Sequence, residues 1–174
     1  MKTRAANALW IASCLPAWRR FQYAAHHVEE TQTALLSNYL KNNTETTYGR
    51  KYQFHQIKSA SQYQARLPLT SYDDYTEYIQ HIGDGEVSVL TSEPVRMFEL
   101  SSGSTAASKL IPYTSTLKAE FQRGIAPWIY NLYTSIPELQ HGSAYWSVTP
   151  LVNGKRFTPA GIPKIGRASC RERV

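Results

Sequence analysis

The chain has 174 residues, a length typical of one domain or of part of a larger one. Hydrophobic residues make up 42% of it, which excludes a disordered chain, and the formal net charge of +6 is spread without a basic block, which argues against a nucleic-acid-binding protein. Two cysteines, Cys14 and Cys170, and five scattered histidines fit neither a disulfide framework nor a metal site.

The first predicted element is a helix over about residues 3–21, broken or bent at Pro16, whose apolar side is formed by Leu9, Trp10, Cys14 and Trp18. The stretch 11–14 also resembles a bacterial lipoprotein cleavage box, but the apolar segment before it is shorter than a signal core. No apolar run reaches the roughly 20 residues that span a bilayer. We therefore expect a buried first helix, a cytoplasmic protein and no membrane partner.

Three further helices are predicted before residue 86. The first covers about residues 27–42 and is followed by a turn centred on Gly49; its buried stripe is Val28, Leu35, Leu36, Tyr39 and Leu40. Ser59 or Ser61 caps a short helix that ends before Pro68, and Ser71 caps the next, which ends at 83–85. Asp73 and Asp74 follow in the first turn of this helix, where carboxylates interact favourably with the positive end of the helix dipole. Adjacent positions on a helix do not face each other, so we do not expect the two carboxylates to act as a catalytic pair.

Strands are predicted at about 87–90, 95–100, 110–113 and 144–149. Between the last two, Thr114 or Ser115 caps a helix of about twenty residues that is kinked or broken at Pro127. Its apolar residues recur at helical spacing: Leu117, Phe121, Ile125, Trp128, Ile129 and Leu132. This order of elements indicates an α/β architecture in which ligands bind at strand ends.

The segment 101–109 connects two of these predicted strands. It is rich in hydroxyl side chains, contains Gly103, has no acidic residue and is closed by Lys109. Backbone N–H groups and hydroxyls donate to phosphate oxygens, and a lysine adds a positive charge. The composition indicates a phosphate-binding loop, although alone it fits a plain surface loop equally well.

Several short motifs occur in a distinctive order: Asn7–Trp10, Thr47–Arg50, Leu67–Tyr72, Gly85–Glu86, Ser101–Thr105 followed by Lys109–Pro112, Ala144–Pro150 and Gly161–Pro163. Together they resemble the auxin-responsive Gretchen Hagen family of acyl acid–amido synthetases, most closely its bacterial-type members. The resemblance covers nearly the whole chain. It implies an α/β fold in which N-terminal helices precede the start of an adenylate-forming, luciferase-like mixed-sheet domain that is truncated here.

The resemblance also implies an activity. Such enzymes use ATP and Mg²⁺ to convert a small-molecule carboxylic acid to an acyl-AMP, and they pass the acyl group to an amino acid. The loop matches the family's first nucleotide motif, so the phosphate-binding role would fall to Ser101, Ser102, Gly103, Ser104, Thr105 and Lys109. Where many members have further glycines, this chain has Ala106, Ala107 and Ser108, which puts the mobility of the loop in doubt.

Acid-binding residues are less clearly indicated, and no catalytic residue or metal ligand is assigned. Family members place part of the acyl pocket on the helix after the loop, where Arg123 has the geometry to pair with a carboxylate. A solvated surface arginine is the alternative. Tyr145 and Trp146 either line the same pocket or belong to a core strand.

The resemblance also divides the chain. Residues 1–163 match an incomplete N-terminal portion of the adenylate-forming domain, whereas residues 164–174 look like a sequencing-adapter sequence read in frame. The family's later nucleotide motifs have no counterpart here, so we expect this chain alone to lack activity. Two other hypotheses stay open: an adenylating enzyme of the acyl-CoA ligase type, and a short non-catalytic protein that binds a nucleotide or a partner.

Overall fold

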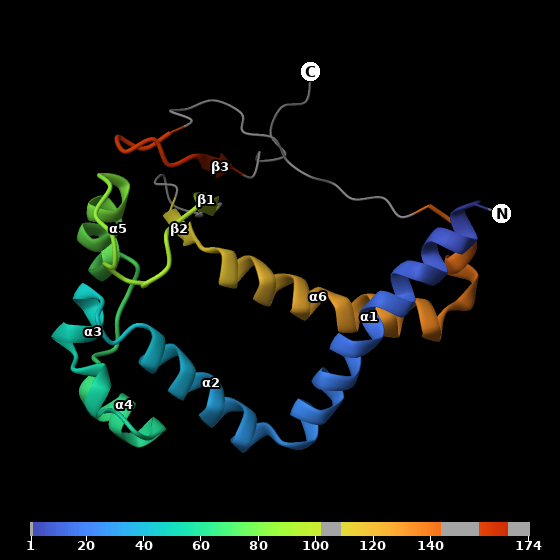
Figure 1. Ribbon diagram of the computed structural model, residues 1–174, viewed down its shortest axis with the longest axis horizontal. Coiled ribbons are helices and arrows are strands. Elements are labelled where there is room, and N and C mark those ends of the chain that lie inside the picture. The colour runs from blue at the N-terminus through green and yellow to red at the C-terminus, as the bar shows by residue number, and fades with distance from the viewer. Residues whose placement is uncertain (1, 102–108, 144–156, 167–174) are drawn as a thin grey trace. The chain divides into compact units, whose positions relative to one another are not determined.

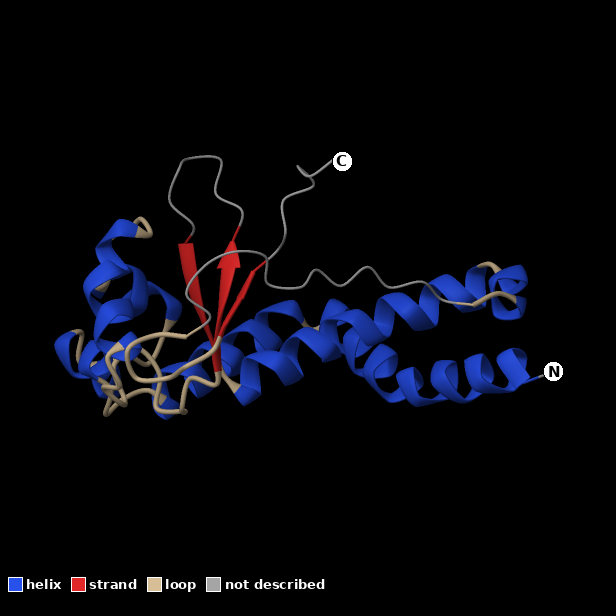
Figure 2. Cartoon of the chain, turned by 90° about the horizontal axis from the view of Figure 1, so that it is seen from above, coloured by secondary structure: helices blue, strands red, loops and turns tan. Residues whose placement is uncertain are grey.

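The chain folds into helices and a small mixed sheet, which confirms the expected α/β class (Figures 1 and 2). A computed structural model describes residues 2–101, 109–143 and 157–166. Two compact units divide the chain, one formed by residues 1–31 and 116–147 and the other by residues 32–115 and 148–174. None of the helices in the described ranges is long and apolar enough to cross a membrane.

In the first unit, α1 (Lys2–His26) packs against α6 (Ser115–Ser135), and the two ribbons cross in Figure 1. Their core consists of Ile11, Cys14, Ile129 and Tyr133, with Trp10 edge-on to Tyr133. The predicted apolar side was wrong at Leu9, whose residue surface is 74% exposed. Residues that are two positions apart in a helix point about 200° away from each other, so Leu9 faces away from Ile11.

The prolines break neither long helix. Both α1 and α6 continue through Pro16 and Pro127, which excludes a break at either proline; the predicted alternative of a bend or kink stays a prediction. After α6, the 3₁₀ turn η3 (Pro137–His141) is held by Asn7, whose side-chain amide donates to the carbonyl oxygens of Gln140 and Gly142, both at 2.9 Å. A proline removes one backbone hydrogen bond, and the packing along these helices outweighs that loss.

The predicted helix over 27–42 is confirmed as α2 (Val28–Asn42), but its buried stripe is narrower than expected. Leu40 is buried and Leu36 half-buried, whereas Val28, Leu35 and Tyr39 are exposed. The same holds for α6, where Phe121 and Trp128 are exposed. Helical spacing identifies an apolar face, but not how much of that face neighbouring elements cover.

The short helix α3 (Thr47–Lys51) follows α2 in the second unit. Gly49 lies inside this helix, so the turn predicted at Gly49 was wrong. Thr46, fully buried, accepts a hydrogen bond from the Gly49 N–H at 2.9 Å. The N–H groups of Thr47 and Tyr48 donate to the carbonyls of Ser88 and Val89 at 2.8 and 3.0 Å. Because those carbonyls satisfy the helix start, residues 87–90 form no strand, contrary to prediction.

Two helical segments follow. After the 3₁₀ turn η1 (Phe54–Gln56), α4 (Ala60–Arg66) starts at the predicted cap Ser59; then η2 (Asp73–Tyr75) leads into α5 (Thr76–Gly83), which ends where predicted. The predicted capping role of Ser71 was wrong. Its N–H and hydroxyl donate to the Asp74 carboxylate at 2.6 and 3.0 Å, and these hydrogen bonds hold the pKa of Asp74 below its usual value.

The described strands form one sheet of order β2-β1-β3. Strand β1 (Met97–Ser101) pairs antiparallel with β2 (Lys109–Tyr113) and parallel with β3 (Lys164–Gly166). Phe98, with no exposed surface, joins the sheet to a core of Ile79, Ile82 and Val89. Strand β3 thus begins inside the predicted tail 164–174; the division at residue 163 stays a prediction. The strand predicted at 144–149 lies outside the described residues.

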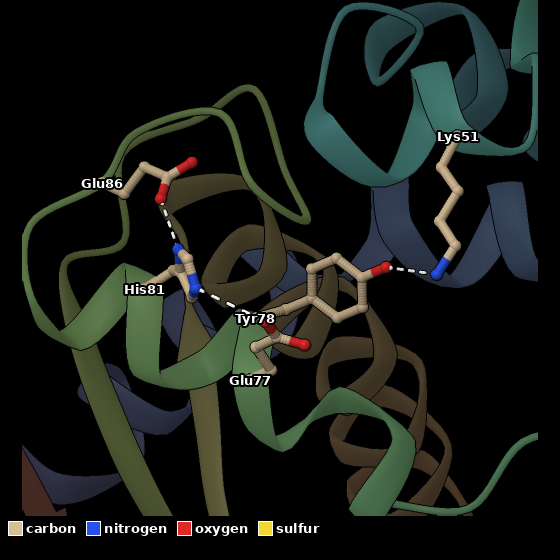
Figure 3. Close-up of polar contacts among 5 residues, drawn as sticks. All are labelled: Lys51, Glu77, Tyr78, His81 and Glu86. Atoms are coloured by element: carbon tan, nitrogen blue, oxygen red, sulfur yellow. Dashed lines mark hydrogen bonds and ion pairs between the residues drawn. The ribbon is translucent and has the colours of Figure 1, made fainter.

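At the C-terminal end of α5, His81 forms a polar contact with Glu86 in the segment that follows the helix (Figure 3). His81 Nδ1 lies 2.6 Å from Glu86 Oε2, and its Nε2 lies 3.9 Å from Glu77 Oε1. The chain turns back at Gly85, whose φ of +102° suits glycine, and the Glu86 N–H donates to the His81 carbonyl at 2.9 Å. The hydrogen bond with Glu86 raises the pKa of His81, and the charges of Glu86, Glu77 and Asp84 add to the effect.

We predict that Gly49→Ala destabilises the protein, whereas Gly124→Ala does not. A Cβ at Gly49 would lie 1.9 Å from the Asn43 carbonyl oxygen, while at Gly124 it would meet nothing within 4 Å. Overpacking against backbone costs about 1–3 kcal/mol, and alanine is better than glycine in an exposed helix by roughly 0.5–1 kcal/mol. Thermal unfolding followed by circular dichroism measures both; an unchanged Tm for Gly49→Ala would contradict this packing.

We also predict that the His81–Glu86 contact stabilises the fold more at pH 6 than at pH 9. Because the folded state raises the pKa of His81, the contribution is fully present below the ordinary histidine value of 6.5 and is lost as the pH rises through the folded value. The Tm difference between the wild type and His81→Gln should therefore shrink with rising pH. His55→Gln, at an exposed histidine without such a contact among the described residues, is the control; equal differences at both pH values would refute the pairing.

Candidate functional site

The two ends of the predicted phosphate loop lie opposite each other. Ser101 is the last residue of β1, Lys109 is the first residue of β2, and the two are register partners in the antiparallel pair. The other predicted phosphate-binding residues, Ser102, Gly103, Ser104 and Thr105, lie outside the described residues. The structure thus fixes where the loop leaves and re-enters the sheet.

Lys109 is exposed and lies against an aromatic ring. Its Nζ is 5.1 Å from the centroid of the Tyr72 ring, within the range of a cation–π contact. Tyr72 precedes η2 and is separated from Lys109 by more than thirty residues of chain. The ammonium group of Lys109 therefore lies beside the ring of Tyr72, which belongs to the segment before η2.

The hydroxyl of Tyr72 binds the backbone next to Lys109. It accepts from the Leu110 N–H at 2.8 Å and donates to the Leu110 carbonyl at 3.3 Å. In an antiparallel pair, successive residues direct their backbone groups alternately toward and away from the partner strand. The Phe98 N–H donates to Pro163, toward β3, so its neighbours on β1 face β2 and Leu110 faces away from β1. Among the described residues, the Tyr72 hydroxyl thus pairs with both backbone groups of Leu110 on the side of β2 that faces away from β1.

Sequence reasoning missed Tyr72 as a site residue. The motif Leu67–Tyr72 stood out in the sequence, but no role for its tyrosine followed from it. The contact joins residues 38 positions apart, which periodicity and local motifs do not report. Partial burial of Tyr72 against the Phe98 core keeps the ring in place.

The predicted acid-binding residues are not brought together within the described part of the chain. Arg123 lies on α6, where its side chain is 58% exposed and its guanidinium is 3.8 Å from Glu120. That exposure and pairing favour a solvated surface arginine, and the carboxylate role stays a prediction. Tyr145 and Trp146 lie outside the described residues.

The residues at the two described ends of the loop, Ser101 and Lys109, are of the types predicted to bind phosphate. Within the ranges that the structure describes, no group of three or more His, Cys, Asp or Glu side chains is arranged to hold a metal ion. A lysine and a hydroxyl residue instead flank the entrance to a hydroxyl-rich loop, and such donors match phosphate oxygens.

Comparison with known proteins agrees with the motif order. The chain is 29% identical over 154 residues to the probable indole-3-acetic acid-amido synthetase GH3.1 of Arabidopsis thaliana, which covers 84% of this chain and 25% of that protein. It is 31% identical over 109 residues to the jasmonoyl--L-amino acid synthetase GH3.5 of Oryza sativa subsp. japonica, covering 62% and 19% of the two chains. The chain thus spans about a quarter or less of the length of these relatives.

Solved structures show the same fold. The GH3.15 acyl acid amido synthetase in complex with 2,4-DB superposes with a TM-score of 0.73 at 24% identity, covering 90% of this chain and 27% of that one. The model of the GH3 family N-terminal domain matches residues 17–169. Most of the sequence is included in that match, and the chain therefore belongs to the GH3 family as part of its N-terminal domain.

Proposed function

We propose that this chain is the first part of an ATP-dependent acyl acid–amido synthetase and that its 101–109 loop binds the triphosphate of ATP. The single observation that carries the proposal is the register pair Ser101–Lys109, which brings both ends of a hydroxyl-rich loop to the end of one strand pair. The names of the relatives, which are amido synthetases, support the same reaction class.

The donor set of this loop fits a nucleotide phosphate. Lys109 supplies a compact positive charge, the serine and threonine hydroxyls supply donors, and Gly103 allows close approach of the backbone. ATP with Mg²⁺, when bound, supplies the leaving pyrophosphate that lets a carboxylate be activated. The role of the chain's own residues is to hold and orient the phosphate oxygens and to offset their negative charge.

The carboxylic acid and the acceptor amino acid are the substrates of the whole enzyme in this proposal. Because the chain matches about a quarter of its relatives' length, further groups that select both substrates, beyond the predicted Arg123, Tyr145 and Trp146, are expected in the remainder of such an enzyme. We propose that residues 1–174 alone do not complete the reaction, since they contain one nucleotide motif only.

The reaction class is tested with the complete gene product. We expect acid-dependent exchange of pyrophosphate into ATP, and release of AMP when an amino acid is added as acceptor. Offering coenzyme A in place of the amino acid separates an amido synthetase from an acyl-CoA ligase. Absence of any acid-dependent turnover would contradict the proposal and favour a non-catalytic binding protein.

We predict that Lys109→Met in the complete protein lowers kcat/KM for ATP by about 10²-fold, the size typical of removing one preorganised charge-stabilising donor. The charge leaves the phosphate site, while the exposed position leaves the fold intact. Lys58→Met, at another exposed lysine of the same unit, is the matched control and should change kcat/KM less than twofold. Equal effects of the two substitutions would remove Lys109 from the site.

A further inference from the structure

We propose that Tyr72 is the positioning residue for Lys109: its ring holds the ammonium group at the mouth of the loop, and its hydroxyl fixes the strand from which Lys109 projects. The inference rests on the proposed function in one respect, that Lys109 meets the phosphates of ATP. The contact between Tyr72 and Lys109 is a separate claim with its own measurement.

The ring of Tyr72 restricts the position of the Lys109 ammonium group. A lysine side chain has a flexible four-carbon stem, so an exposed lysine at the end of a strand samples many positions. Here the ring of Tyr72 lies 5.1 Å from the Lys109 Nζ and attracts it through the negative face of the π system. The preferred position of the charge is thereby set by a side chain outside the loop.

The hydroxyl of Tyr72 anchors the backbone next to Lys109. Both polar backbone groups of Leu110, the residue after Lys109, are bound by the one Tyr72 hydroxyl at 2.8 and 3.3 Å. These bonds fix the outer edge of β2 beside the loop, where strand pairs otherwise fray. Tyr72 and Leu110 also pack together against the core that contains Phe98. Ring and hydroxyl therefore act on consecutive residues of one strand.

Tyr72 is itself held in place by its neighbours. Directly after it, the Asp74 carboxylate accepts two hydrogen bonds from Ser71, and η2 runs into α5. The neighbouring ring of Tyr75 packs against the same core. Tyr72 is thus mounted on an ordered turn and not on a free loop, which is what a positioning residue requires.

The kinetic test uses the complete protein and separates ring from hydroxyl. Tyr72→Leu should raise KM for ATP about fivefold, the range of an exposed cation–π contact, with KM for the acid changed less than twofold. Tyr72→Phe keeps the ring and should restore most of the ATP affinity. In a Lys109→Met background, Tyr72→Leu should have no further effect on KM for ATP. An undiminished effect of Tyr72→Leu in that background would overturn the proposal, and an equal loss in Tyr72→Phe would overturn the role of the ring.

The contact is measured independently of activity by NMR. Reductive methylation with ¹³C-formaldehyde labels the lysine amines of this chain, and Lys109→Arg assigns the Lys109 signal. The signal should be shifted upfield by the Tyr72 ring in the wild type and in Tyr72→Phe. An unshifted signal in the wild type overturns the positioning role even if Tyr72→Leu does not fold. A shifted signal without acid-dependent exchange in the complete protein refutes the proposed function and leaves the Tyr72 contact standing.

Discussion

The antiparallel pairing of β1 and β2 is the constraint on which the candidate site depends. Its register sets Ser101 opposite Lys109, so the intervening loop must leave and re-enter the sheet at one fixed place. Phe98 of β1 stabilises this pairing, because its side chain is fully buried and its N–H donates to the Pro163 carbonyl at 2.8 Å. A one-residue slip of register would turn Lys109 to the opposite face and remove it from Tyr72.

The surroundings of the sheet show how short family motifs act in the structure. Thr46 and Gly49 close α3 so tightly that a side chain at Gly49 has no space, and α3 in turn holds the carbonyls of Ser88 and Val89. Burial, followed by the hydrogen bond to Tyr75, raises the pKa of the Tyr48 hydroxyl. Through Val89, these residues support the core that contains Phe98.

The sequence predicted the elements better than their faces. Helices α2, α4 and α6 and strands β1 and β2 follow from spacing, caps and alternation, because these signals are local. Leu9, Tyr39 and Trp128 were misplaced because exposure depends on which elements cover a helix, and that is a tertiary property. The strand predicted at residues 87–90 does not form for the same reason, since the carbonyls of Ser88 and Val89 accept hydrogen bonds from the start of α3. The loop was found from its composition, but Tyr72 was not, since its contacts span 38 positions.

We propose that Lys109 lies beside the phosphates of bound ATP, and chemical labelling tests this placement. An acyl-phosphate derivative of ATP transfers its acyl group to a lysine amine that lies next to the phosphate chain. In the complete protein, mass spectrometry should find the acyl group on Lys109, and an excess of ATP should suppress that labelling while leaving the exposed Lys58 unaffected. Labelling of Lys109 that is no stronger than that of Lys58, or that ATP does not suppress, would contradict the account.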